Sequence, residues 1–285
     1  MTPDFVEDEY NPRRRIPDYA SVFARWSALA EAARSAVPMR ELRYGPSTAE
    51  TLDFFPPCVS DAPLLVFLHG GYWRALDKRD FSWLAPPYIR AGAAVAIINY
   101  ALAPAVPLER IVAQVRRALA WLSHNAPRLG IDSDRIVCSG HSAGGHLTAM
   151  MWMDEAPADT SSPRIALNPA RPASGLALSG LFDLRPLLHA PFLKEDLSLT
   201  PERAASLSPA LLKPDQAARL LLAVGAEESD EFHRQSIQLK CAWPAAIVEG
   251  PLSIPGANHF TVCDALATPD NSLFESCLRL LGVTN

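Results

Sequence analysis

The sequence lacks the features that usually mark membrane proteins and nucleic-acid-binding proteins. No apolar run reaches the roughly 18 residues that a membrane-spanning helix needs. The acidic start of the chain has no apolar core of signal-peptide length. The net charge is −5 and no basic stripe occurs, which argues against nucleic acid and anionic membranes as partners. We therefore expect a cytoplasmic protein with no nucleic-acid partner and no membrane partner.

Cysteine is scarce, and its arrangement gives no sign of a disulfide framework or a metal site. The count of five is odd, and no pair has the C-x-x-C spacing of metal-binding cysteines. We expect buried or semi-buried free thiols in a reducing compartment, and no metal or cofactor. The five residues are Cys58, Cys138, Cys241, Cys263 and Cys277.

Length and composition are those of a globular protein that can bury a large core. The chain has 285 residues, of which 49% are hydrophobic and 20% are charged. One α/β domain of this length is ordinary, so we expect a single domain over residues 1–285. A homodimer is left open as its oligomeric state.

Apolar segments alternate with amphipathic segments along most of the chain. Strands that are apolar throughout are typical of a mostly parallel sheet with helices on both faces. An antiparallel hairpin is predicted at the start of the sheet, over 41–44 and 51–55. The other predicted strands cover 63–69, 93–100, 135–139, 175–179, 219–224 and 246–249.

The helices are predicted from apolar residues that recur at a spacing of three to four. Residues 1–16 and 154–172 are predicted to be irregular. Prolines break residues 184–216 into short helical pieces, which suggests a small lid-like insertion beside the site. The predicted helices cover 18–37, 79–91, 108–125, 142–153, 230–242 and 271–281.

The most informative motif is G-x-S-x-G at residues 140–144, which lies between a predicted strand and a predicted helix. A serine on a sharp strand-to-helix turn needs small neighbours, because the turn crowds the adjacent side chains. Such a turn lifts the Ser142 hydroxyl clear of the sheet and directs the N-terminus of the next helix toward it. The motif therefore predicts that Ser142 is a nucleophile.

A serine hydroxyl needs a base within hydrogen-bond reach and a carboxylate that orients this base. On a sheet of this kind the chain order is serine, acid, histidine. Among the seven histidines, His259 is the one that follows the last predicted strand, in a loop after Gly256. We predict that His259 is the base.

The acid is expected in the loop after strand 219–224, which offers four carboxylates within five positions. We select Glu228, with Asp230 as the second candidate. Asp183 follows an earlier strand and is a third candidate, although it could instead cap the helix that begins near Leu184.

An oxyanion needs preorganised N–H donors. One donor is expected from Ala143, the residue after the nucleophile. The others are expected from Gly70 and Gly71 at the end of strand 63–69, because glycines let the backbone approach a substrate oxygen.

Several motifs together resemble the kynurenine formamidase (arylformamidase) family of α/β-hydrolases, close to the hormone-sensitive-lipase-like esterases. The likeness covers nearly the whole chain. Its motifs are E-Y-N-P at 9–12, H-G-G-Y-W at 69–73, N-Y-A-L-A-P at 99–104, G-H-S-A-G-G-H-L at 140–147, S-G-L-F-D-L at 179–184 and E-F-H-R-Q-S at 231–236.

The resemblance implies an α/β-hydrolase fold and hydrolysis of N-formyl-kynurenine to kynurenine and formate without a metal. It implies that Ser142 is the nucleophile, His259 the base and Glu228 the acid. The sequence departs from the family pattern at one of these positions, because animal members carry aspartate where this chain has Glu228.

An aryl formamide with an amino-acid head would need aromatic walls and a cation for its carboxylate. Arg74 or Lys78 could meet the carboxylate. An alternative function, a carboxylesterase for small acyl or aryl esters, needs only the apolar walls. Hydrolysis of another amide or carbamate is a further, less favoured alternative. A non-catalytic ligand-binding role is less favoured because both Ser142 and His259 are present. The aromatic residues expected around the small-molecule ester or amide are Tyr72, Trp73, Phe182 and Phe260.

Overall fold

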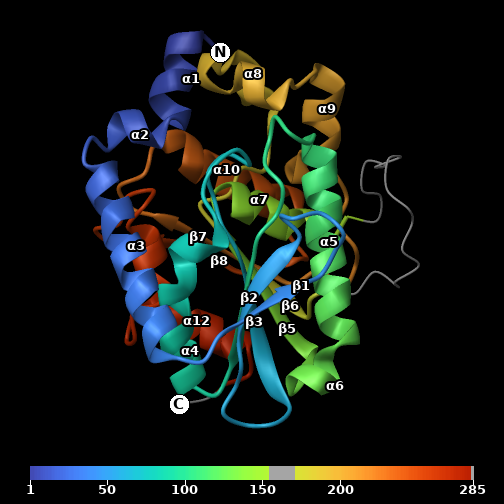
Figure 1. Ribbon diagram of the computed structural model, residues 1–285. Helices are drawn as coiled ribbons and strands as arrows, with labels where there is room; N and C mark the ends of the chain where they lie inside the picture. Colours follow the sequence, from blue (N-terminus) through green and yellow to red (C-terminus); the bar gives the residue numbers. More distant parts are fainter. Residues whose placement is uncertain (154–170, 284–285) are drawn as a thin grey trace.

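The computed structural model describes residues 1–153 and 171–283, and these contain one sheet of eight strands (Figure 1). The predicted loop over 154–172 lies almost wholly outside the described residues. The strand order across the sheet is β1-β2-β4-β3-β5-β6-β7-β8. The strands are β1 Arg40–Arg43, β2 Thr51–Phe55, β3 Ala62–Leu68, β4 Ala94–Ile98, β5 Ile131–His141, β6 Ser174–Leu178, β7 Leu220–Gly225 and β8 Ile247–Ile254.

The sheet is parallel from β4 to β8, and only β1 and β2 run antiparallel to their neighbours. All six parallel strands therefore end at the same edge. The loops that follow β3, β5, β7 and β8 carry the residues expected at the site. The prediction of an α/β fold with a mostly parallel sheet is confirmed.

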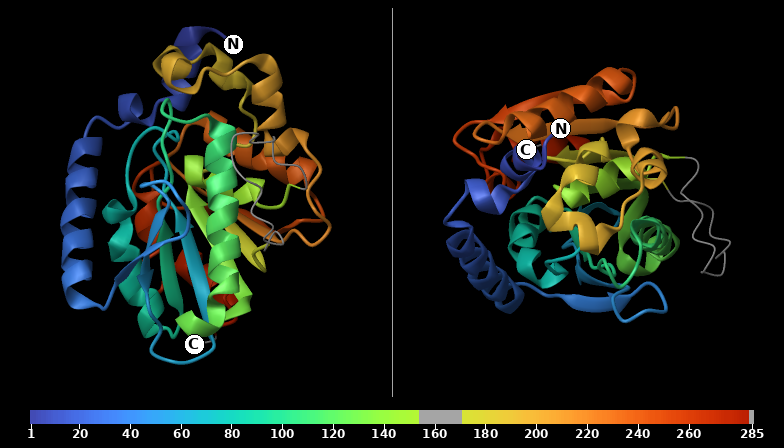
Figure 2. Two further views of the ribbon diagram at one scale, coloured as in Figure 1. Left: turned by 45° about the vertical axis from the view of Figure 1, so that its right-hand side comes forward. Right: turned by 90° about the horizontal axis from the view of Figure 1, so that it is seen from above.

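Two apolar cores lie on opposite faces of the sheet, because successive side chains of a strand point to opposite sides. In β3, Leu64, Val66 and Leu68 belong to one core, whereas Leu65 and Phe67 belong to the other. Helices cover both faces (Figures 1 and 2). The first core packs on α5 Leu108–His124, α7 Ala143–Met150 and α10 Asp230–Ala242, and the second on α3 Tyr19–Ala36, α4 Ala85–Arg90, α11 Val262–Ala265 and α12 Ser272–Leu280.

The prediction of an irregular segment over 1–16 is wrong. The segment forms two short helices, α1 Pro3–Tyr10 and α2 Pro12–Arg15. Each helix has its proline at the first position, where a missing N–H costs nothing. The Thr2 hydroxyl caps the first helix by accepting from the N–H of Phe5. The prolines that suggested a loop therefore mark helix starts.

The helix predicted over 79–91 is divided into a 3-10 helix, η1 Lys78–Leu84, and α4 Ala85–Arg90. Pro86 and Pro87 explain the division, because proline is tolerated only in the first turn of a helix. Strand β5, which precedes Ser142, and the last strand, β8, are both longer than predicted. The short helix α11 was not predicted.

Residues 184–216 form short helical pieces, as predicted, and they pack tightly on the rest of the chain. Their apolar side chains join the first core. Arg203 donates to both carboxylate oxygens of Glu109 in α5, at 2.7 Å each. Figure 1 shows α1 beside α8 at the top of the molecule. The pieces are η2 Arg185–His189, η3 Pro191–Leu193, α8 Lys194–Leu197, α9 Pro201–Ser206 and η4 Pro209–Leu211.

All five cysteines are free thiols, as predicted. Cys138, Cys263 and Cys277 are buried, but Cys58 and Cys241 are exposed, so the expectation of burial is wrong for these two. Cys58 lies in the loop between β2 and β3, and Cys241 lies near the C-terminal end of α10. Within 1–153 and 171–283, no helix is long and apolar enough to cross a membrane.

Lys78 lies in a buried ionic cluster and cannot meet a substrate carboxylate. Its ammonium donates to Asp53 at 2.5 Å and to Glu41 at 2.6 Å. Asp53, on β2, is fully buried and also pairs with Arg34 at 2.8 Å. Lys78 itself is only 2% exposed. The suggestion that Lys78 could bind substrate is therefore wrong, and its charge serves the fold.

We expect Lys78→Met to lower the free energy of unfolding by about 3 kcal/mol, because it leaves the buried Asp53 carboxylate short of a cation. The matched control is Glu41→Gln, which removes the half-exposed partner of the same ammonium and should cost less than about 1 kcal/mol. Urea denaturation of the two variants measures both values. A stable Lys78→Met variant with a raised KM would contradict this assignment.

Candidate active site

The turn at Ser142 has the backbone strain of a nucleophile elbow. Ser142 lies between β5 and α7 with φ of +55° and ψ of −116°, which non-glycine residues rarely adopt. Its N–H donates to the carbonyl of Leu178 on β6 at 2.8 Å, which holds the turn in place. A Cβ on Gly144 would lie 2.0 Å from the carbonyl oxygen of Leu68, so only glycine fits there.

Ser142, His259 and Glu228 form one chain of hydrogen bonds. The Nε2 atom of His259 lies 3.1 Å from the Oγ atom of Ser142, and its Nδ1 atom lies 2.6 Å from an oxygen of Glu228. All three residues are less than 10% exposed. The geometry lets the imidazole take the serine proton while the carboxylate faces the other ring nitrogen.

The Glu228 carboxylate is held from both sides. Its second oxygen accepts from the N–H of Gly225 at 2.7 Å and from the hydroxyl of Ser179. Ser179 follows β6 and has a positive φ of 51°. These bonds stabilise a buried charge and aim the remaining oxygen at His259. Ser179 could not be singled out by sequence reasoning, although it begins the S-G-L-F-D-L motif.

The other two candidates for the acid lie elsewhere. Asp230 is exposed at the first position of α10. Asp183 accepts from the side chain of Arg185 at 2.8 and 3.0 Å and from its N–H at 3.1 Å. Asp183 thus pairs with Arg185, and the N-cap of η2 is Leu184, not Asp183. Of the three carboxylates, only Glu228 reaches His259.

His141, the residue before Ser142 in the elbow motif, braces the loop that carries His259. Its Nε2 atom lies 2.7 Å from the backbone carbonyl of His259, so this nitrogen carries the proton and donates it. Burial, together with the nearby His259 ring, lowers the pKa of His141 well below its ordinary value. His141 is therefore neutral near pH 7 and adds no charge beside His259.

The expected oxyanion donors lie against the nucleophile. Ala143 is the first residue of α7 and directly follows Ser142. A Cβ on Gly70 would lie 3.2 Å from the Cβ of Ser142, so the Gly70 backbone runs close beside the serine. Gly71 has φ of +96°, and a Cβ there would lie 2.3 Å from the carbonyl oxygen of Ala75. Glycine is thus required at 71, whereas a side chain at 70 would make a tight contact with the elbow.

The loop after β4 braces this glycine loop, which explains why N-Y-A-L-A-P accompanies H-G-G-Y-W. The hydroxyl of Tyr100 donates to the carbonyl of His69 at 2.7 Å. The N–H of Ala103 donates to the carbonyl of Trp73 at 2.8 Å. The two bonds clamp both ends of the H-G-G-Y-W loop.

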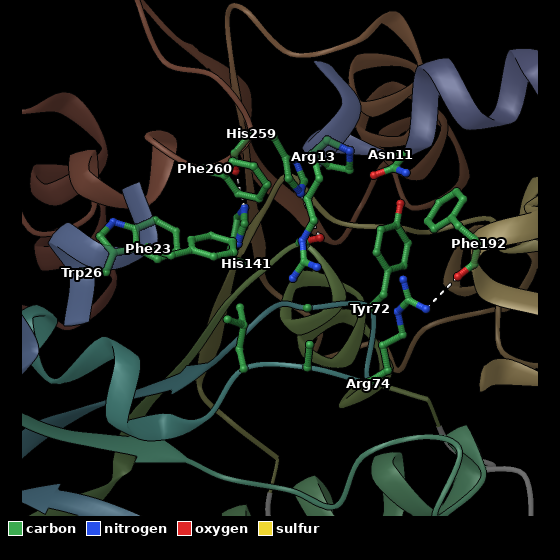
Figure 3. A pocket seen from close by; sticks show the side chains of 15 residues that line it. Asn11, Arg13, Phe23, Trp26, Tyr72, Arg74, His141, Phe192, His259 and Phe260 are labelled. Atoms are coloured by element: carbon green, nitrogen blue, oxygen red, sulfur yellow. Dashed lines mark hydrogen bonds between the residues drawn. The ribbon is translucent and has the colours of Figure 1, made fainter. Parts of the chain in front are cut away.

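A cavity opens beside Ser142 and His259, and its walls are mainly aromatic (Figure 3). In the figure, Phe23, Phe260 and His141 lie on one side, and Tyr72 and Phe192 on the other. The aromatic residues that line it are Phe23, Trp26, Tyr72, Phe192 and Phe260.

Two of the four aromatic residues predicted for the substrate site line this cavity, namely Tyr72 and Phe260. Trp73 and Phe182 are fully buried in the first core and are not among the lining residues. The edge of the Trp73 ring faces His146, with ring centroids 4.9 Å apart. The predicted role of Trp73 and Phe182 in the substrate pocket is therefore wrong. Their side chains pack in the first core instead.

The N-terminal segment forms part of the cavity wall, which the prediction of an irregular start did not anticipate. Asn11, Pro12 and Arg13 line the cavity. The hydroxyl of Tyr72 donates to the carbonyl of Tyr10, and the hydroxyl of Tyr10 donates to Glu231 on α10. These bonds join the E-Y-N-P motif to the E-F-H-R-Q-S motif. The two motifs were therefore the sequence signal for the N-terminal part of the wall.

Within the described residues, no group of three or more His, Cys, Asp or Glu side chains could hold a metal ion.

Comparison with known proteins relates the whole chain to formamidases. Kynurenine formamidase from Danio rerio is 31% identical over 297 aligned residues, covering 99% of this chain and 97% of the relative. Kynurenine formamidase from Drosophila melanogaster is 27% identical and covers 84% of this chain and 80% of the relative. Carboxylesterase NlhH from Mycobacterium tuberculosis is 39% identical, but over 34% of this chain and 31% of the relative.

The BD-FAE family model matches residues 52–166, which is less than half of the chain. A crystal structure from Silicibacter sp. TM1040, provisionally described as a thioesterase, superposes with a TM-score of 0.82 at 33% identity and covers 98% of both chains. An esterase from Thermogutta terrifontis shares the fold, with a TM-score of 0.64, 20% identity and coverage of 86% of this chain and 92% of that one.

The full-length identity to formamidases, the eight-stranded sheet and the enzyme relatives support one conclusion. The protein is a hydrolase of the α/β-hydrolase fold, and the chain belongs to the kynurenine formamidase family.

Proposed function

We propose that the protein hydrolyses an aryl formamide of the N-formyl-kynurenine type through a formyl-enzyme intermediate on Ser142. The observation that carries the proposal is the hydrogen-bonded chain from Ser142 through His259 to Glu228, beside an aromatic cavity. The full-length relatedness to kynurenine formamidases supports the choice of a formamide.

In the first step, the Oγ atom of Ser142 attacks the formyl carbon while His259 takes the hydroxyl proton on Nε2. The carbonyl oxygen becomes an oxyanion, which the N–H groups of Ala143, Gly70 and Gly71 receive. Each such donor stabilises the transition state by a few kcal/mol. The Glu228 carboxylate stabilises the imidazolium that forms.

The tetrahedral intermediate then breaks its C–N bond, and His259 returns the proton to the departing aryl amine. The amine leaves, and the formyl group remains as an ester on Ser142. A water molecule attacks this ester with His259 again as the base, which releases formate and restores the serine hydroxyl. The bonds made and broken balance without an added oxidant, metal or cofactor.

The cavity wall includes a part of the chain that the formamidase alignment covers. Asn11, Pro12, Arg13, Phe23 and Trp26 all line the cavity, and all precede the segment 52–166 that the BD-FAE model matches. The alignment with the Danio rerio formamidase covers 99% of the chain and so includes this N-terminal part. The wall thus belongs to the portion shared with formamidases.

Hydrolysis of small acyl or aryl esters is the second candidate function. The same serine, histidine and carboxylate perform it, and the carboxylesterase and esterase relatives support it. An aryl ester carries a better leaving group than an aryl amide, so some ester turnover is expected even from a formamidase.

We also infer that the chain acts as one domain, with residues 184–216 as a wall of the site, because Phe192 of that segment lines the cavity. A cytoplasmic location is proposed as well. The exposed free thiols of Cys58 and Cys241 suit a reducing compartment.

We expect the enzyme to hydrolyse both N-formyl-kynurenine and p-nitrophenyl acetate, and Ser142→Ala to lower kcat for both by about 10⁴-fold or more, because no nucleophile remains. Absorbance assays of product release measure both reactions. Turnover of the ester without turnover of the formamide would refute the formamidase proposal. Unchanged activity in Ser142→Ala would refute the serine mechanism altogether.

We expect Glu228→Gln to lower kcat by about 10³- to 10⁴-fold, since the imidazole loses the charge that holds its tautomer. Asp230→Asn, two residues away and exposed, is the matched control and should stay within about twofold of wild type. Glu228→Asp keeps the charge but shortens its reach, so an intermediate loss is expected. If Asp230→Asn were the inactive variant, the assignment of the acid would be wrong.

A further inference from the structure

We propose that Arg13, in the N-terminal helix α2, is a specificity-determining residue that binds a carboxylate on the leaving group of the substrate. The inference rests on the proposed function and goes further, since it assigns the recognition of an anionic substrate to a particular side chain. It also makes the N-terminal segment part of the substrate site.

Arg13 reaches into the cavity that contains Ser142 and His259. Figure 3 shows its side chain between the aromatic walls, with Phe23 and Phe260 on one side and Tyr72 on the other. Its guanidinium carbon lies 5.3 Å from the centre of the Tyr19 ring and 5.8 Å from that of Phe23. Such contacts orient an arginine without neutralising its charge.

Among the described residues, Arg13 has no ion-pair partner, whereas the two arginines that follow it each have one. Its neighbours Arg14 and Arg15 pair with Asp8 at 2.9 Å and Glu9 at 3.0 Å, respectively. Arg13 has no carboxylate partner among residues 1–153 and 171–283. In a helix with three consecutive arginines, the one that faces the cavity is thus the one left without an anion.

Arg74, the other arginine that lines the cavity, already has an anionic partner. The guanidinium of Arg74 forms an ion pair with Asp196 and donates to the carbonyl of Phe192 at 2.7 Å. None of the described residues that line the cavity is acidic. Among the described residues, Arg13 therefore gives the cavity a positive charge without an anionic partner, which complements an aromatic substrate that carries a carboxylate.

The position of Arg13 is set by a network on the preceding residues. The hydroxyl of Ser229, the residue after Glu228, donates to the backbone carbonyl of Glu9 at 2.6 Å. The side chain of Gln235 donates to the Tyr10 hydroxyl at 3.0 Å. Because these bonds join the segment to α10 and its N-cap, α2 is held at a fixed place over the site.

The test compares substrates that carry a carboxylate with analogues that lack it. One pair is N-formyl-kynurenine and N-(2-acetylphenyl)formamide, which lacks the amino-acid head. The second pair is 4-acetoxyphenylacetate and phenyl acetate. We expect Arg13→Met to lower kcat/KM at least about tenfold for the carboxylate-bearing member of each pair, mainly through KM, and to change the members without a carboxylate less than about twofold.

Arg13→Lys should recover part of the loss, since it restores the charge without the fork geometry. Arg14→Met is the matched control, because it removes a neighbouring arginine that does not line the cavity, and it should leave both pairs unchanged. Thermal unfolding of each variant separates a loss of recognition from a loss of fold.

Equal losses on the members with and without the carboxylate in both pairs, or no loss on any, would overturn the role of Arg13. Failure of the wild type to hydrolyse either formamide would refute the formamidase proposal alone. The ester pair would then still test the recognition of a carboxylate by Arg13.

Discussion

The buried hydrogen bond between Glu228 and His259 is the interaction on which the rest of the site depends. It joins the loop after β7 to the loop after β8, at the edge where the parallel strands end. A carboxylate this deeply buried is tolerated only when its oxygens are satisfied, and Gly225 and Ser179 provide the remaining donors. The backbone carbonyl of His259 is held in turn by His141 of the elbow. The loops that follow β5, β6, β7 and β8 are thereby joined by hydrogen bonds around the imidazole of His259.

A second network adds the N-terminal segment to this centre. Tyr10 lies between Tyr72 of the glycine loop and Glu231 of α10, and it is fully buried. Burial, with the Glu231 carboxylate close by, raises the pKa of Tyr10, so its hydroxyl stays protonated and keeps donating. The segment is therefore anchored both to the loop that contains Gly70 and Gly71 and to α10, which follows the loop that carries Glu228.

Much of the fold was predictable because its signals are local. Apolar runs such as 219–224 and the helical periodicity of 108–125 depend on neighbouring residues, and the structure places β7 and α5 there. Errors arose where local signals were ambiguous. Pro3 and Pro12 can mark either a loop or the first position of a helix, and only the packing of Val6 and Tyr10 decides between them.

The site was predictable to the extent that chain order reflects chemistry. The succession of serine, acid and histidine led to Ser142, Glu228 and His259, which the structure brings together. The choice between Glu228 and Asp230 was not available from spacing, because it depends on which side chain points inward. The wall of the cavity was least predictable. An aromatic residue after a glycine loop can face either the cavity, as Tyr72 does, or the core, as Trp73 does.

We propose above all that the hydrogen-bonded chain from Ser142 through His259 to Glu228 makes Ser142, and no other side chain, the nucleophile. The most direct test is stoichiometric labelling with diethyl p-nitrophenyl phosphate, followed by mass spectrometry of the peptides. The account predicts one label per chain, on Ser142, with activity lost in proportion to labelling and with labelling greatly slowed in Glu228→Gln. A label on another residue, or full activity after complete labelling, would contradict it.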